Sequence, residues 1–161
     1  MRVRRAVAYG VLGAAAISVV SWGLRAVGLP IRLELLLGTM LGQKPSPEAF
    51  FVGLLMHLAI GGAFGLLYGW LFETVWNHGG AGMGMILGVV HAALIGMAVG
   101  LTPQFHPLVP ERIPDPGAFF ANVGILGVVA FFGVHILYGA IVGHGYGHVA
   151  TERQWAPLGR T

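Results

Sequence analysis

Four long apolar runs, separated by short polar connections, dominate the chain. They cover about residues 6–27, 49–75, 83–101 and 118–149. A helix needs about 20 consecutive apolar residues to cross the hydrocarbon core of a bilayer, and each run is long enough. The pattern predicts one domain, residues 1–161, folded as an all-α membrane bundle of four transmembrane helices.

The connections on one side of this bundle carry their own patterns. Residues 31–42 (IRLELLLGTMLG) are apolar but too short to span, and they predict a short interfacial or re-entrant helix. Residues 102–116 contain five prolines and predict an irregular, rigid connection. Residues 151–161 form a short polar tail.

Composition agrees with a membrane location. Hydrophobic residues make up 56% of the chain and charged residues 9%, whereas soluble domains carry about 25% charged residues. The net charge is +3, and the one basic cluster is Arg2, Arg4 and Arg5. We expect this cluster to contact lipid head groups. The sequence has no basic stripe with interleaved aromatic residues, so we expect no nucleic-acid partner. The chain has no cysteine, which excludes thiol chemistry.

The distribution of charge predicts an orientation. An even number of spans places the basic cluster on the same side as Arg153 and Arg160. On the other side, four basic residues face four acidic ones: Arg25, Arg32, Lys44 and Arg112 against Glu34, Glu48, Glu111 and Asp115. The positive-inside rule then predicts that both termini are cytoplasmic.

The run at 6–27 exceeds the usual signal-peptide core and has no A-x-A site, so we interpret it as a span.

One phrase occurs twice. HLAIGGAFGLLYG at 57–69 and HILYGAIVGHGYG at 135–147 share a histidine, three glycines and a tyrosine at the same spacing. PSPEAFF at 45–51 matches PDPGAFF at 114–120, and AVGLP at 26–30 resembles AVGLTP at 98–103. These landmarks predict two parallel hairpin repeats, about 6–78 and 79–150.

The proline motifs predict where two of the helices begin. Ser46 and Asp115 are expected N-caps, with Pro47 and Pro116 at the first helical positions. Phe120 lies fifteen residues before its histidine, whereas Phe51 lies six before its own. The last helix is therefore expected to carry an insertion near its outer end.

The stretches MHLAIGGAFGLLYG, GVVHAALIGMAVG and HILYGAIVGHGYG also carry a resemblance. Over most of residues 28–147 the chain resembles an uncharacterised family of small four-helix bacterial inner-membrane proteins. The resemblance implies the fold and a location in the bacterial inner membrane. It implies no activity.

Glycines four apart in these runs predict faces for helix packing. Small residues at this spacing let membrane helices approach closely. The expected packing residues are Gly61, Gly65, Gly69, Gly139, Gly143 and Gly147. Such faces suit partners that are themselves transmembrane helices, either other subunits or a second copy.

Three histidines lie near the middle of predicted spans. His57, His91 and His135 are candidate ligands of haem b or a metal ion, because ionisable groups at that depth often mark a site. The alternative is that they donate to neighbouring helices and only pack, since no carboxylate lies deep in a span to orient a ligand. His144 and His148, four residues apart, are a second candidate metal pair or else solvated side chains.

Two further expectations concern tyrosine and catalysis. Tyr68 and Tyr146 follow their histidines by eleven residues and are expected to anchor the bundle at the interface. Standard catalytic motifs such as G-x-S-x-G and H-E-x-x-H are missing from the sequence. The leading hypothesis is a non-catalytic accessory or structural subunit of a membrane complex or homo-oligomer. The alternatives are a haem b or metal-binding protein that uses the intramembrane histidines, and a small transporter or channel.

Overall fold

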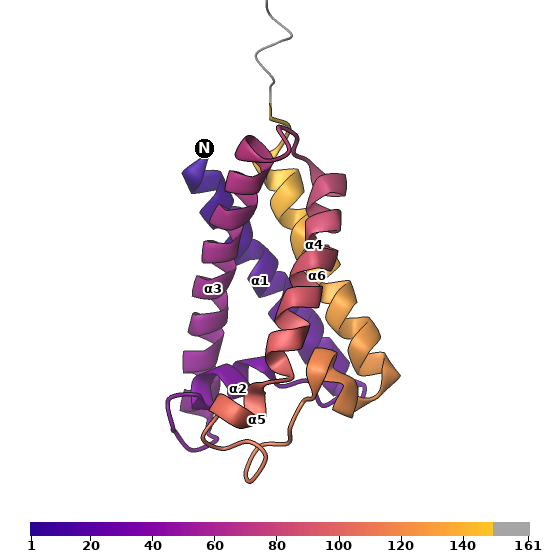
Figure 1. The fold of residues 1–161 in the computed structure, drawn as a ribbon. Helices are drawn as coiled ribbons and strands as arrows, with labels where there is room; N and C mark the ends of the chain where they lie inside the picture. Colours follow the sequence, from indigo (N-terminus) through magenta and orange to yellow (C-terminus); the bar gives the residue numbers. More distant parts are fainter. Residues whose placement is uncertain (150–161) are drawn as a thin grey trace, which may run out of the picture.

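The computed structural model describes residues 1–149, which form an all-helical bundle (Figure 1). Four helices are long and apolar enough to cross a membrane: α1 (Val3–Ala26), α3 (Pro47–Thr74), α4 (Ala81–Val99) and α6 (Ile125–Tyr146). Three short helices connect them: α2 (Leu33–Thr39), α5 (Thr102–Phe105) and the 3-10 helix η1 (Ala118–Val123). The predicted all-α fold with four spans is confirmed. The predicted tail 151–161, with Arg153 and Arg160, lies outside the described residues.

The start of α3 is the predicted one. The Ser46 hydroxyl accepts a hydrogen bond from the Ala49 amide at 3.2 Å, and Pro47 occupies the first turn. Such a cap satisfies one of the backbone N–H groups that a helix leaves unpaired at its N-terminus. The structure also places a short helix, α2, within the predicted segment 31–42.

The start of α6 differs from the prediction. Asp115 caps no long helix; its carboxylate accepts from the Gly117 amide at 2.9 Å and closes a local turn. Phe119 and Phe120 then adopt positive φ angles of 57° and 62°, and Gly124, at 94°, precedes the first residue of α6. The predicted insertion is therefore the folded segment η1, because these backbone angles interrupt the helix.

The spans form two close pairs, α1 with α3 and α4 with α6. Figure 1 shows α1 crossing the bundle obliquely, so that it also lies along α6. Helices α3 and α4 make no extended contact with each other. We call the end of the bundle that holds Arg2 and Tyr146 the terminal end, and the opposite end, with α2 and α5, the loop end.

Glycines mediate both close pairs, in the same register. A Cβ at Gly10 would overlap the carbonyl oxygen of Gly61 and the Cα of Gly65. In the other pair, Gly84 meets Gly139 and Gly143 in the same way. Close backbone approach provides the dispersion contacts that hold helices together where lipid offers no hydrophobic drive.

Helix α2 lies across the loop end and carries a buried acid. A Cβ on Gly38 would overlap the backbone of Ala49, so α2 packs directly on the first turns of α3. Glu34 of α2 is fully buried and pairs with Arg25 of α1 at 3.3 Å. The sequence pattern placed Arg25 at the end of the first run and Glu34 in the segment 31–42, on the same side of the membrane, without pairing them. The structure uses this pair to join α1 to α2.

Candidate functional site

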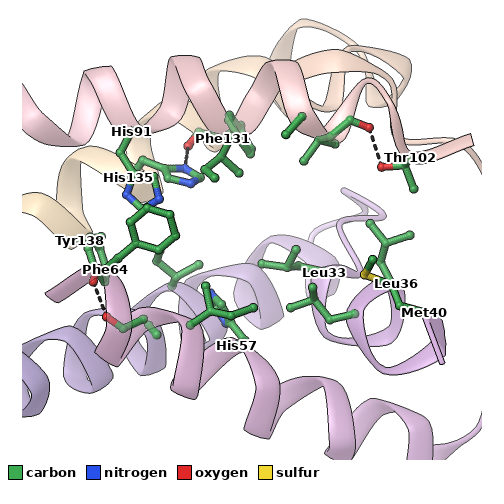
Figure 2. Close-up of a pocket in the computed structure, with 18 of the residues that line it drawn as sticks. Leu33, Leu36, Met40, His57, Phe64, His91, Thr102, Phe131, His135 and Tyr138 are labelled. Atoms are coloured by element: carbon green, nitrogen blue, oxygen red, sulfur yellow. Dashed lines mark hydrogen bonds between the residues drawn. The ribbon is translucent and has the colours of Figure 1, made fainter. Parts of the chain in front are cut away.

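A cavity of about 300 Å³ lies inside the loop-end half of the bundle (Figure 2). All four spans contribute to its wall, and α2, α5 and His106 close its loop end. Most of the lining side chains are aliphatic or aromatic. The polar ones are His57, His91, Thr102, His106, His135 and Tyr138.

The three predicted histidines all line this cavity. Figure 2 shows His91 and His135 side by side on one wall and His57 on the opposite wall. His57 and His135 are buried, with 8% and 9% of their surface exposed, and His91 is half-buried. The structure thus brings together three residues that lie 34 and 44 positions apart in the chain.

Each imidazole is held through its Nδ1 atom. Nδ1 of His57 lies 3.0 Å from the Ser18 hydroxyl, and Nδ1 of His91 lies 3.3 Å from the Tyr68 hydroxyl. Nδ1 of His135 donates to the Phe131 carbonyl, one turn earlier in α6, at 2.7 Å. These bonds fix the ring orientations.

Aromatic rings support the histidines. Phe64 stacks on His91 with ring centroids 4.0 Å apart, and Phe131 lies 4.4 Å from His135. Tyr138 packs edge-on against His91, and its hydroxyl donates to the Gly61 carbonyl at 2.5 Å. That hydrogen bond joins α6 to α3, and both of its residues line the cavity.

The histidines lie at mid-membrane depth. His57 is ten residues from the loop end of α3, His135 is ten from that of α6, and His91 is eight from that of α4. At a rise of 1.5 Å per residue, they lie about 12–15 Å from that end. The hydrocarbon core is about 30 Å thick, so the imidazoles lie near its centre.

The cavity reaches the surface of the bundle near α2, α3 and α5. Several of its lining residues are exposed and apolar: Met40 is 45% exposed, Ile60 40% and Phe105 73%. The opening of the cavity is therefore itself apolar.

His106 closes the loop end, and sequence reasoning did not identify it. Its Nε2 donates to the Leu36 carbonyl at 2.9 Å, and its Nδ1 accepts from the Leu108 amide at 3.1 Å. Thr39 lies 3.3 Å from the same Nε2. The proline-rich connection is thereby joined to α2. The sequence contained no signal for this, because His106 lies in a segment without periodicity.

The two tyrosines expected at the interface are instead core residues. Tyr68 is 2% exposed and Tyr146 is fully buried. The Tyr146 hydroxyl donates to Glu73 and receives a hydrogen bond from the Arg2 amide at 3.1 Å. The prediction of interfacial anchors is wrong, because both rings are buried inside the bundle, where Tyr146 lies against Gly69.

The predicted glycine faces lie inside the bundle. Gly61, Gly65, Gly139 and Gly143 contact the partner helix of their own pair, and Gly69 lies against the Tyr146 ring. Gly147 has a different role. It follows the last residue of α6 with a φ of 79°, a conformation that favours glycine at a helix C-terminus.

The second histidine pair does not share a helix face. His144 is in the last turn of α6, whereas His148 follows the turn at Gly147. The four-residue spacing therefore does not place the two side chains on one helix face. The His148 ring instead lies 6.4 Å from that of His78. The helix ends before His148 and therefore removes the geometry on which this metal prediction depended.

The cavity histidines do not form a compact metal cluster. Within residues 1–149, no three His, Cys, Asp or Glu side chains lie close enough to hold one metal ion. His91 and His135 are in edge-to-face contact, with centroids 5.0 Å apart. Axial ligands bind a haem iron from opposite faces, and rings this close leave no room for a porphyrin between them. Haem ligation that involves His57 stays a prediction.

Comparison of the chain with protein-family models, with curated proteins and with solved structures gives no significant match. The functional argument therefore rests on the site itself.

Proposed function

We propose that this protein binds a small, mostly apolar molecule taken from the bilayer, in the cavity lined by His57, His91 and His135. One observation carries the proposal: an apolar cavity of about 300 Å³ at mid-membrane depth has three imidazoles on its walls. Ligand sites in proteins are typically apolar, with a few polar groups that orient the ligand, and measure about 300–1,000 Å³. This cavity matches that description at the lower end of the range.

The size of the cavity argues against a packing defect. Empty space in a protein interior costs about 24 cal/mol per Å³. This cavity is open at Met40, Ile60 and Phe105, so that cost does not apply in full, but an apolar space of about 300 Å³ that lipid or a ligand can reach does not stay empty. We infer that the cavity is occupied in the membrane.

The imidazoles indicate that the occupant is more than an acyl chain. A hydrocarbon chain makes no hydrogen bonds, and leaving polar groups against it costs free energy. Nonpolar side chains at these three positions would suit an acyl chain better. A mostly apolar molecule that carries a few polar atoms can contact the apolar side chains of the wall and also form hydrogen bonds with the imidazoles.

The accessory-subunit hypothesis stays a prediction. Its main support was the set of glycine faces, and these are occupied by contacts within the chain. A transporter would be favoured by interruptions at matched positions of the two repeats. The interruption before α6, at Gly124, has no counterpart within α3. The ligand-binding proposal is therefore the one that the geometry supports best.

The membrane and the orientation belong to the same proposal. The terminal end carries Arg2, Arg4 and Arg5, so the positive-inside rule favours a cytoplasmic terminal end. The resemblance to small bacterial inner-membrane proteins supports that membrane. Alkaline phosphatase, which is active only outside the cytoplasm, should be active when fused after Gly42 and inactive when fused after Gly79. The reverse pattern would contradict the orientation.

The test of binding compares two neighbouring residues of α4. Ile95 lines the cavity, whereas Leu94 is 59% exposed toward lipid. We would purify wild type, Ile95→Trp and Leu94→Trp in mild detergent, extract each with organic solvent and identify the extracted molecules by mass spectrometry. Wild type and Leu94→Trp should carry one enriched small molecule at near-stoichiometric amount, and Ile95→Trp should lose most of it.

Two outcomes would overturn the proposal. One is that wild type carries only bulk phospholipid. The other is that all three proteins carry the same molecule in equal amounts, which would place it outside the cavity. Gel filtration and circular dichroism check that Ile95→Trp is folded.

A further inference from the structure

The hydrogen bonds of the three histidines determine what each offers to the cavity. The Ser18 and Tyr68 hydroxyls have, among the described residues, no hydrogen-bond acceptor other than Nδ1 of His57 and of His91. Each hydroxyl therefore donates, and the ring proton of a neutral imidazole then resides on Nε2. His135 is the opposite tautomer, because its Nδ1 donates to a carbonyl. A ligand in the cavity would therefore meet two N–H donors, on His57 and His91, and one nitrogen acceptor, on His135.

These Nε2 atoms are available to a ligand. Within residues 1–149, the one buried side-chain oxygen or nitrogen without a partner is Oε1 of Glu34. The Nε2 atoms of the three histidines also have no hydrogen-bond partner but are not buried, so each keeps accessible surface, and all three rings line the cavity. The other polar groups of the wall are already used: Tyr138 donates to Gly61, Thr102 to Val99 and His106 to Leu36.

The charge of the wall restricts the ligand to a neutral molecule. None of the residues that line the cavity is an aspartate, glutamate, lysine or arginine. An anionic or cationic group at this depth would have no counter-ion, and burial of an unpaired charge is costly. Fatty acids and phospholipid head groups are thereby disfavoured.

The arrangement of donors and acceptor selects among neutral lipids. His57 lies on the wall opposite His91 and His135, so the ligand must present polar atoms on two sides (Figure 2). A sterol or a long-chain alcohol has a single polar end, which bilayers keep at the interface. A quinone has two carbonyl oxygens on opposite edges of a flat ring, and its reduced form has two hydroxyls there.

We infer that the cavity holds the head group of a membrane quinone. His57 and His91 donate from Nε2 to the two carbonyl oxygens, and Nε2 of His135 accepts from a hydroxyl of the reduced form. The rings of Phe64 and Phe131, which line the cavity, supply apolar contacts for the quinone ring, and the opening at Met40, Ile60 and Phe105 lets its hydrocarbon tail leave the cavity. This inference rests on the proposed function and names the chemical class of its ligand.

The test compares decylubiquinone with decylbenzene, which shares the tail but lacks the oxygens. Each is titrated into detergent-purified protein, and the bound amount is measured after gel filtration against empty micelles. We expect saturable binding of one decylubiquinone per protein, with at least tenfold weaker binding of decylbenzene. The infrared carbonyl stretch of the bound quinone should shift to lower frequency, because a hydrogen bond from imidazole weakens the C=O bond.

Variants test the role of the rings. His91→Phe keeps the flat ring and removes the donor, so quinone affinity should fall about tenfold, the effect of one lost hydrogen bond. Decylbenzene binding should not change. The matched control is His78→Phe, which replaces an exposed histidine outside the cavity. The comparison of the two probes on wild type needs no variant, so it stays decisive if His91→Phe does not fold.

The outcomes separate this inference from the proposed function. Equal binding of both probes, with no infrared shift, would overturn the quinone assignment and leave an apolar ligand site. Binding of neither probe, together with no enriched molecule in native extracts, would overturn both.

Discussion

Replacing Gly139 with alanine tests the packing that frames the cavity. A Cβ on Gly139 would overlap the carbonyl group of Gly84 and press on the amide of Gly88. All of these atoms are backbone, so no side chain can rotate away and the two helices must separate. Overpacking of this kind costs about 1–3 kcal/mol, and we expect the upper end of that range.

The matched control lies on the same helix. Gly133 has no atom within 4 Å of its would-be Cβ and faces outward. Alanine stabilises a helix by about 1 kcal/mol relative to glycine, and both variants share this gain. Gly133→Ala should therefore be up to about 1 kcal/mol more stable than wild type, and Gly139→Ala about 2 kcal/mol less stable.

The assay is reversible unfolding by SDS in mixed micelles, followed by near-ultraviolet circular dichroism of the buried tyrosines. The two variants should differ by about 3 kcal/mol in free energy of unfolding. The double variant Gly84→Ala/Gly139→Ala should lose less than the sum of the single changes, because the first already separates the helices. If Gly139→Ala and Gly133→Ala unfold at the same SDS fraction, the packing argument is refuted.

Three further predictions concern polar contacts and use the same unfolding assay. Tyr138→Phe removes the hydrogen bond to Gly61 and should cost about 0.6 kcal/mol, the average for such bonds in membranes; no loss would mean that the bond does not hold α6 to α3. Arg25→Met leaves Glu34 buried without its cation and should cost about 3–5 kcal/mol, whereas the double variant with Glu34→Gln should recover most of that loss. An additive double variant would show that the pair is not coupled. His106→Ala should speed amide hydrogen exchange in α2 and in the proline-rich connection by at least tenfold, because it removes the hydrogen bond to Leu36 that joins them and the bond from Leu108 within the connection; unchanged exchange there would contradict its closing role.

The spans and one helix start were predictable, because they depend on local sequence. Apolar run length gave the four helices, and the Ser46–Pro47 pair marked the start of α3. The start of α6 was not predictable. Phe119 and Phe120 adopt positive φ angles that large side chains rarely take. Tertiary contacts, such as the fit of Phe119 against Gly96, accompany the local turn at Asp115 and Gly117 that holds them.

The site was predictable in part. Depth along the helices indicated that His57, His91 and His135 would lie at one level, and they do line one cavity. The cavity itself depends on α3 and α4 staying apart, and sequence patterns do not predict which helices make no extended contact. The burial of Glu34 was equally hidden, because a charged residue near an apolar run normally marks the water boundary.

The bonds that satisfy buried polar groups also bear on biosynthesis. Ser18 with His57 and Arg25 with Glu34 are complete within the first 57 residues of the chain. These two pairs can therefore form once α3 has been synthesised, whereas Thr39 and Tyr68 meet their partners His106 and His91 only later. Tyr138 then arrives with α6 and donates to a carbonyl that is already in place. The first hairpin alone thus contains two of the buried polar pairs of the bundle, and the wall of the cavity is complete only when the second hairpin adds His91, His135 and Tyr138.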